Sequence, residues 1–211
     1  MDAWSTFEMA LDARHSRKIE LLMAAEKAAL DGNSVSPCDR DILLCCIAAV
    51  RVAERRGSIE EVADLSLAVS SRCGSSWPLY HLAESANAVG AHEHVLSAVS
   101  NIDAGFFESQ DLMWRSARCA ELRAVAMIKL MYSPRELSPV VSAIAAWYAA
   151  NGECHDFAPP SDLVAALIEA GIPFQPSLEM LHHSLDLEMW LGPKVAESVR
   201  RALRGGATSD G

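Results

Sequence analysis

The sequence lacks any apolar run long enough to cross a membrane. Its longest runs, 42–50 and 140–150, are far shorter than the roughly 20 residues that a spanning helix needs. Residues 1–5 have neither a basic nor an apolar segment, so we expect no signal peptide. These absences predict a cytoplasmic protein with no membrane partner.

Basic residues are also scarce. No Lys or Arg occurs between Arg135 and Lys194, and the formal net charge of the chain is −10. Affinity for nucleic acid depends on Lys and Arg side chains that neutralise phosphates, so we expect no nucleic-acid partner. The acidic second half has two interpretations: a solvated face that keeps the protein soluble, or a patch that attracts a basic partner.

Motifs that bind cofactors or assemble active sites are missing. The sequence has no glycine-rich phosphate-binding loop and no Gly-x-Ser-x-Gly nucleophile motif, so we expect no cofactor. Six cysteines, at 38, 45, 46, 73, 119 and 154, form no Cys-x-x-Cys pair. This spacing fits neither a disulfide framework nor a zinc ribbon, and it favours small buried thiols in a reducing compartment.

What the sequence does contain favours helices. Hydrophobic residues make up 51%, Ala and Leu dominate, and β-branched runs are few, which predicts an all-α fold. We expect one helical domain over 1–204, with sub-units 1–104 and 109–204, and a disordered tail over 205–211. Start and stop signals place its helices at about 6–31, 36–55, 59–72, 77–89, 91–101, 109–132, 133–150, 161–171, 177–191 and 193–204.

A repeat links two of these helical pairs. Gly57 and Gly90 lie 33 residues apart, and similar apolar residues surround each of them, which is typical of stacked helix–turn–helix units. The stretch 42–102 resembles the tetratricopeptide family of helical repeats. It departs from that family at its preferred aromatic position, occupied by Cys46 and Leu79, and it lacks the closing prolines. The resemblance implies stacked helical hairpins; the alternative is an irregular multi-helix bundle.

The same resemblance implies a binding groove lined by the first helix of each pair. Its ligand-facing positions fall on two sets of residues. In this interpretation two arginines grip a carboxylate and a tyrosine stacks on the ligand, whereas in the alternative the arginines are simply solvated near a helix end. The sets are Ile47, Arg51 and Arg55, followed by Tyr80, Glu84 and Asn87.

A second group of residues supports a different function. His182 and Asp186 lie one helical turn apart, and the irregular stretch 153–160 includes Cys154 and His155. With His183, such residues could bind a metal ion or supply a thiol nucleophile and its base. The spacing is not that of an established zinc or thiol-enzyme motif.

We therefore expect an interaction module without enzymatic activity. The hypothesis is an adaptor, chaperone or antitoxin-like protein that holds a peptide or partner protein, with a basic partner favoured by the acidic composition. The alternative is a metal- or thiol-dependent enzyme. The sequence leaves the oligomeric state open.

Overall fold

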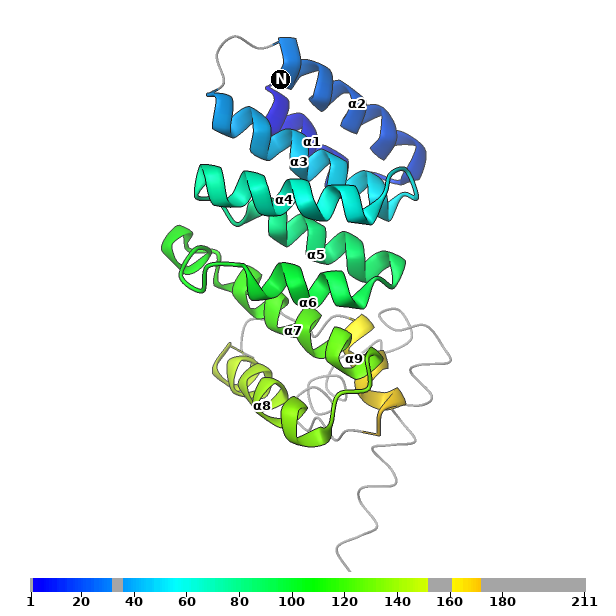
Figure 1. Cartoon of the computed structure of the whole chain (residues 1–211), viewed down its shortest axis with the longest axis vertical. Helices are drawn as coiled ribbons and strands as arrows, with labels where there is room; N and C mark the ends of the chain where they lie inside the picture. Colours follow the sequence, from blue (N-terminus) through cyan, green and yellow to red (C-terminus); the bar gives the residue numbers. More distant parts are fainter. Residues whose placement is uncertain (1, 32–35, 152–160, 172–211) are drawn as a thin grey trace, which may run out of the picture. The chain divides into compact units, whose positions relative to one another are not determined.

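The computed structural model describes residues 2–31, 36–151 and 161–171, and within them all regular secondary structure is helical (Figure 1). The prediction of an all-α fold is confirmed for these residues, and none of their helices is long and apolar enough to cross a membrane. The predicted helices at 177–191 and 193–204 and the tail at 205–211 lie outside them. The elements are α1 (Ala3–Asp12), α2 (His15–Asp31), α3 (Pro37–Ala53), α4 (Ile59–Cys73), α5 (Trp77–Val89), α6 (His92–Ser100), the 3-10 helix η1 (Glu108–Gln110), α7 (Met113–Lys129), α8 (Pro134–Asn151) and α9 (Ser161–Glu169).

Local capping explains the boundaries of the central helices. Ser36 and Ser58 precede α3 and α4, and each side-chain oxygen accepts a hydrogen bond from a backbone N–H of the first turn, at 3.1 and 3.3 Å. Gly74 and Gly90 follow α4 and α5 with φ of 63° and 78°, a left-handed conformation that glycine adopts at little cost. These ends lie within one or two residues of the predicted ones.

The N-terminal part differs from the prediction of one helix over 6–31. The helix is interrupted at Ala13 and Arg14, and the two resulting helices, α1 and α2, pack against each other. The Asp2 carboxylate accepts the backbone N–H of Ser5 at 2.9 Å, so the first helix starts at Ala3, earlier than the predicted residue 6. No glycine or proline lies at this interruption, so the sequence contains no local signal that predicts it.

Contacts divide the chain into two compact units, and the boundary falls between Cys119 and Ala120, inside α7. In the first unit α3 packs against α2, α4 and α5, while α5 packs against α3, α4 and α6. Consecutive helices of this unit lie side by side in Figure 1. The division into sub-units 1–104 and 109–204 stays a prediction.

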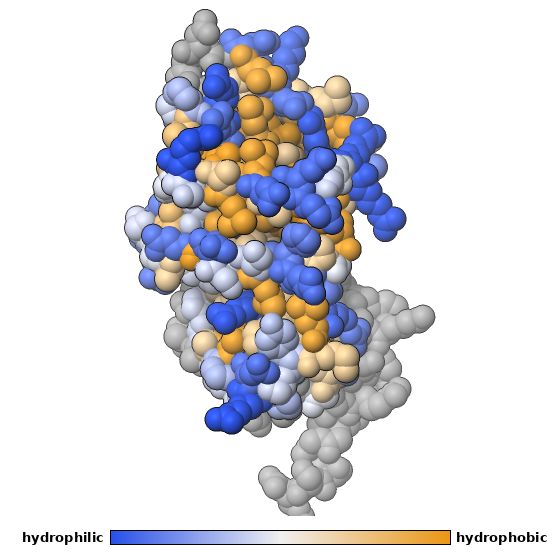
Figure 2. Space-filling model, viewed as in Figure 1, coloured by the Kyte–Doolittle hydropathy of each residue, from blue (hydrophilic) through white to orange (hydrophobic). Residues whose placement is uncertain are grey.

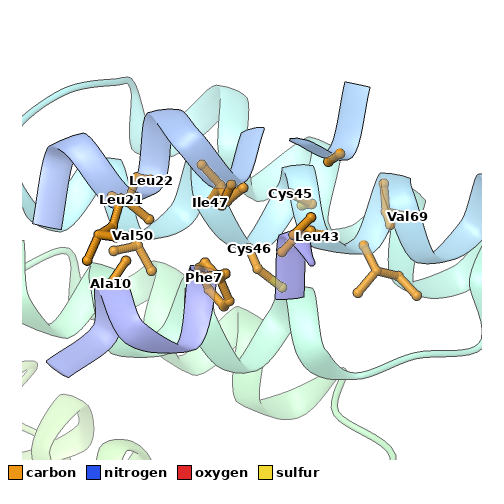
Figure 3. Close-up of a cluster of buried hydrophobic side chains, with 14 residues drawn as sticks. Phe7, Ala10, Leu21, Leu22, Leu43, Cys45, Cys46, Ile47, Val50 and Val69 are labelled. Atoms are coloured by element: carbon orange, nitrogen blue, oxygen red, sulfur yellow. The ribbon is translucent and has the colours of Figure 1, made fainter. Parts of the chain in front are cut away.

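The core of the first unit lies where α1 and α2 meet α3. Phe7 and Ala10 of α1 point toward Cys46, Ile47 and Val50 of α3, as Figure 3 shows, and the first two of these five are fully buried. Leu21 and Leu22 of α2 and Val69 of α4 complete the same cluster. Burying a side chain such as phenylalanine contributes about 1.5–3 kcal/mol, so this cluster holds the first three helices together.

The second unit has a separate core. Val125 of α7, Ile144 of α8 and Leu163 and Leu167 of α9 are buried against one another. Lys129 at the end of α7 forms an ion pair with Glu169 of α9. All of these residues belong to the second unit.

We predict that Gly90→Ala lowers the free energy of unfolding by about 1 kcal/mol, because alanine is strained at the left-handed φ of this position. An added Cβ meets no atom within 4 Å, so the cost is conformational and not steric. Urea unfolding followed by circular dichroism measures it. Gly105→Ala, at a glycine outside the left-handed region, serves as the matched control, and equal stability of the two variants contradicts the prediction.

Candidate functional site

The predicted groove requires α3 and α5 to be neighbours, and they are, but α1 and α2 cover the first of its positions. Ile47 is 1% exposed and belongs to the core cluster that contains Phe7 (Figure 3). Ile47 is therefore buried in the core of the first unit, and a ligand-facing role for it stays a prediction. The physical reason for this burial is the interruption of the helix at Ala13 and Arg14, which allows both α1 and α2 to pack onto α3.

The two arginines at the end of α3 do not act together. Arg51 donates two hydrogen bonds to the carboxylate of Glu26 in α2, at 3.0 and 2.6 Å. Arg55 lies beyond the end of α3, is exposed, and has a left-handed φ of 59°. Arg55 does not continue the helical face that carries Arg51, because α3 ends at Ala53. A binding role for Arg55 stays a prediction.

Tyr80 and Glu84 do share a face of α5, but the chain itself supplies their partners. Tyr80 is 2% exposed and donates its hydroxyl to Glu84 at 3.0 Å. Glu84 accepts two hydrogen bonds from the Arg118 guanidinium, at 2.9 and 3.0 Å. The stacking of Tyr80 on a ligand stays a prediction. Asn87, half-buried one turn further along, stays a prediction.

Arg115 completes this cluster with aromatic contacts. Its guanidinium carbon lies 3.9 Å from the ring centroid of Trp114, 4.5 Å from that of Tyr80 and 5.2 Å from that of Trp77. Such cation–π contacts stabilise by about 0.5–2 kcal/mol each, depending on exposure. Arg115 and Arg118 are not among the site residues predicted from sequence, because no local pattern indicates that they contact residues of α5.

Burial shifts the titration of groups next to this cluster. His81 lies between Phe7 and Trp77, at ring-centroid distances of 5.2 and 5.9 Å, and burial, followed by the charge of Arg115, lowers its pKa to about 3. Burial, followed by the charge of Glu84, raises the pKa of Tyr80. Burial also raises the pKa of Cys45 and Cys46, which makes both thiols poor nucleophiles.

An open pocket of about 400 Å³ lies at the end of α4 and the start of α5. Leu67, Ser70 and Ser71 of α4 line one side of it. The turn 74–76 and Leu79 of α5 line a second side, and the loop 101–106 closes it with Asn101, Asp103 and Phe106. Its volume is in the range of small-ligand and side-chain pockets.

Some polar groups of the pocket lining already accept hydrogen bonds from the chain's own backbone. Ser76 Oγ accepts the backbone N–H of Asp103 at 3.2 Å, which ties the loop to the start of α5. Asp103 Oδ1 accepts the backbone N–H of Gly105 at 3.0 Å, and no Lys or Arg among the described residues forms an ion pair with Asp103. Ser70 Oγ is buried and has no hydrogen-bond partner. The pocket thus combines an unpaired carboxylate with an unsatisfied hydroxyl.

The residues of the alternative enzymatic hypothesis, Cys154, His155, His182, His183 and Asp186, lie outside the described residues. Within the described ranges, no three His, Cys, Asp or Glu side chains are placed to hold a metal ion.

A scan against models of known protein families, a search of curated proteins and a search of solved structures find no match to this chain.

We predict that His81 makes the first unit less stable as the pH falls below about 6.5. The folded-state pKa of about 3 lies below the unfolded-state value of 6.5, so the unfolded chain takes up a proton first. Replacement by leucine, His81→Leu, removes this term and flattens the dependence. Between pH 6.5 and 5 the difference between the two proteins amounts to about 2 kcal/mol.

Urea unfolding at several pH values measures this difference. His94→Leu is the matched control, because His94 lies on the surface side of α6, only half-buried. Parallel pH profiles for wild type and His81→Leu would rule the explanation out.

Proposed function

We propose that the chain is a helical protein-binding module that holds a basic segment of a partner protein. The observation that supports this most is the acidic surface, which consists of the exposed acidic residues that α4, α6 and the loop after α6 carry between Ile59 and Asp111. The five described cysteines are free thiols, which fits a protein of the reducing cytoplasm.

Acidic residues greatly outnumber basic ones in the stretch that forms the acidic surface. Between Ile59 and Asp111 the only Lys or Arg is Arg72, which pairs with Asp41 of α3 at 2.7 Å. Of the acidic residues in this stretch, Glu84 is neutralised by Arg118. A basic segment would complement the remaining charges, and complementary charge raises association rate and selectivity. These remaining residues are Glu60, Glu61, Asp64, Glu93, Asp103, Glu108 and Asp111.

The helical arrangement supports the same proposal. Each of the pairs α3–α4 and α5–α6 packs internally, and α3 packs on α5, as in stacked hairpins of the tetratricopeptide type. Because the chain itself covers much of α3 and α5, we place the partner on the α4–α6 side and not in the groove predicted from sequence. Leu65 and Val89 are 45% and 41% exposed on that part of the chain, and Figure 2 shows apolar residues exposed among hydrophilic ones.

An array of short peptides that vary in charge tests the proposal. We expect the full chain to bind peptides rich in Lys and Arg, with affinity that falls as salt is added, because exposed charges are screened. The double variant Asp64→Lys, Glu108→Lys should weaken binding at least ~10-fold. Fluorescence anisotropy with the best peptide of the array measures the affinity.

Glu8→Lys, Asp12→Lys is the matched control, because it makes the same change in net charge on exposed residues of α1. Equal weakening by both double variants would mean that total charge and not the α4–α6 surface drives binding. Preference for acidic peptides, or no binding at all, would overturn the proposal.

A further inference from the structure

Two cysteines meet at one end of the hairpin formed by α3 and α4. Cys38 lies in the first turn of α3, Cys73 is the last residue of α4, and the Cys38 thiol donates a hydrogen bond to the Cys73 sulfur. An ion pair beside them holds the same two helix ends together, because the Arg72 guanidinium donates to the Asp41 carboxylate at 2.7 Å. The two helices lie side by side in Figure 1. The fold thus brings together two thiols that are far apart in the sequence.

Exposure distinguishes this pair from the other cysteines of the described residues. Cys38 and Cys73 are only half-buried, whereas Cys45, Cys46 and Cys119 are buried. A buried thiol in apolar surroundings is inert, while a thiol that water reaches can react with dissolved oxidants. Among the described cysteines, a dissolved reagent therefore reaches the two that are already in contact.

The contact between the two thiols suits oxidation better than metal binding. Within the described ranges, no third His, Cys, Asp or Glu side chain joins them in a group that could hold a metal ion, and a structural zinc site needs four ligands. The hydrogen bond with Cys73, followed by partial burial, raises the pKa of the Cys38 thiol, so Cys38 keeps its proton and can donate it to the neighbouring sulfur. A disulfide needs its sulfurs about 2 Å apart, and helix ends, which open readily, can make the small movement that this requires.

We propose that Cys38 and Cys73 form a site of reversible oxidation, at which a low-molecular-weight disulfide such as glutathione disulfide converts the two thiols into one disulfide. The thiolate of one cysteine attacks a sulfur of glutathione disulfide, forms a mixed disulfide and expels one glutathione thiolate. The thiolate of the other cysteine attacks the mixed disulfide, forms the bond between Cys38 and Cys73 and expels the second glutathione. The two cysteines lose two electrons and two protons, and glutathione disulfide is reduced to two molecules of glutathione. This site does not depend on the proposed binding function.

Incubation of the reduced, folded full chain with a mixture of glutathione and glutathione disulfide tests the proposal. Intact-mass spectrometry should show a chain that has lost two hydrogen atoms and carries no glutathione. Peptide mapping should place the new bond between Cys38 and Cys73, and dithiothreitol should reverse it. An unchanged mass, or a bond that maps to any other pair of cysteines, would overturn the proposal.

Single variants separate a paired site from two thiols that react independently. Cys38→Ser and Cys73→Ser should each carry at least ~10-fold more bound glutathione than the wild type, because the high effective concentration of the neighbouring thiol no longer drives the second step. Cys154→Ser, which removes a cysteine outside the described residues, is the control and should form the bond as the wild type does. Circular dichroism verifies that each variant is folded. A wild type that accumulates two bound glutathiones and no internal bond would refute the pairing.

The unfolded chain shows whether the fold selects this pair. The same glutathione mixture in concentrated urea should give bonds spread over several pairs of the six cysteines, because no packing then holds two particular thiols together. The folded chain should instead give the bond between Cys38 and Cys73 almost exclusively. An equal preference for this bond in the folded and unfolded chains would mean that the contact between α3 and α4 does not create the site, and the proposal would fail.

Discussion

The packing of α3 against α5 is the constraint on which the first unit depends. Both helices are apolar on more than one side, so neither can satisfy its buried surface with its hairpin partner alone. The remaining apolar surface of α3 packs against α1 and α2. The remaining apolar surface of α5 packs against the aromatic residues near Phe107. Separating the two helices would expose both of these clusters to water, so the stability of both depends on the contact between α3 and α5.

This constraint also explains why two of the charged ligand-facing positions expected from the repeat, Arg51 and Glu84, already have partners within the chain. In a regular array those positions face a groove because nothing else lies over them. Here Arg51 forms an ion pair with Glu26 of α2, and Glu84 forms one with Arg118 of α7. These intramolecular ion pairs occupy the groups that were expected to contact a ligand. The surface that stays open is the side where α4 ends and α5 begins, and the candidate site lies there.

The sequence predicted those features that local chemistry determines. Serine caps at Ser36 and Ser58 and glycine stops at Gly74 and Gly90 placed α3, α4 and α5 closely, because capping acts between residues a few positions apart. The break after α1 has no such signal and depends on packing against α3. The pocket depends on Asp103 meeting Ser76 across 27 residues, and Arg115 meets Tyr80 across a similar separation, so neither arises from a local pattern.

The hydrogen bond between Ser76 and the backbone of Asp103 links the fold to the site. Ser76 does not cap its own helix with its side chain, although serine is well suited to that role, and its hydroxyl instead accepts the N–H of the loop. The helix thus forgoes a cap that typically contributes about 1 kcal/mol, while the loop that carries Asp103 and Phe106 is fixed beside α5. A side chain whose local preference is overridden in this way is expected where geometry at a functional site matters more than helix stability. The same contact that closes the second hairpin therefore also sets the position of the carboxylate.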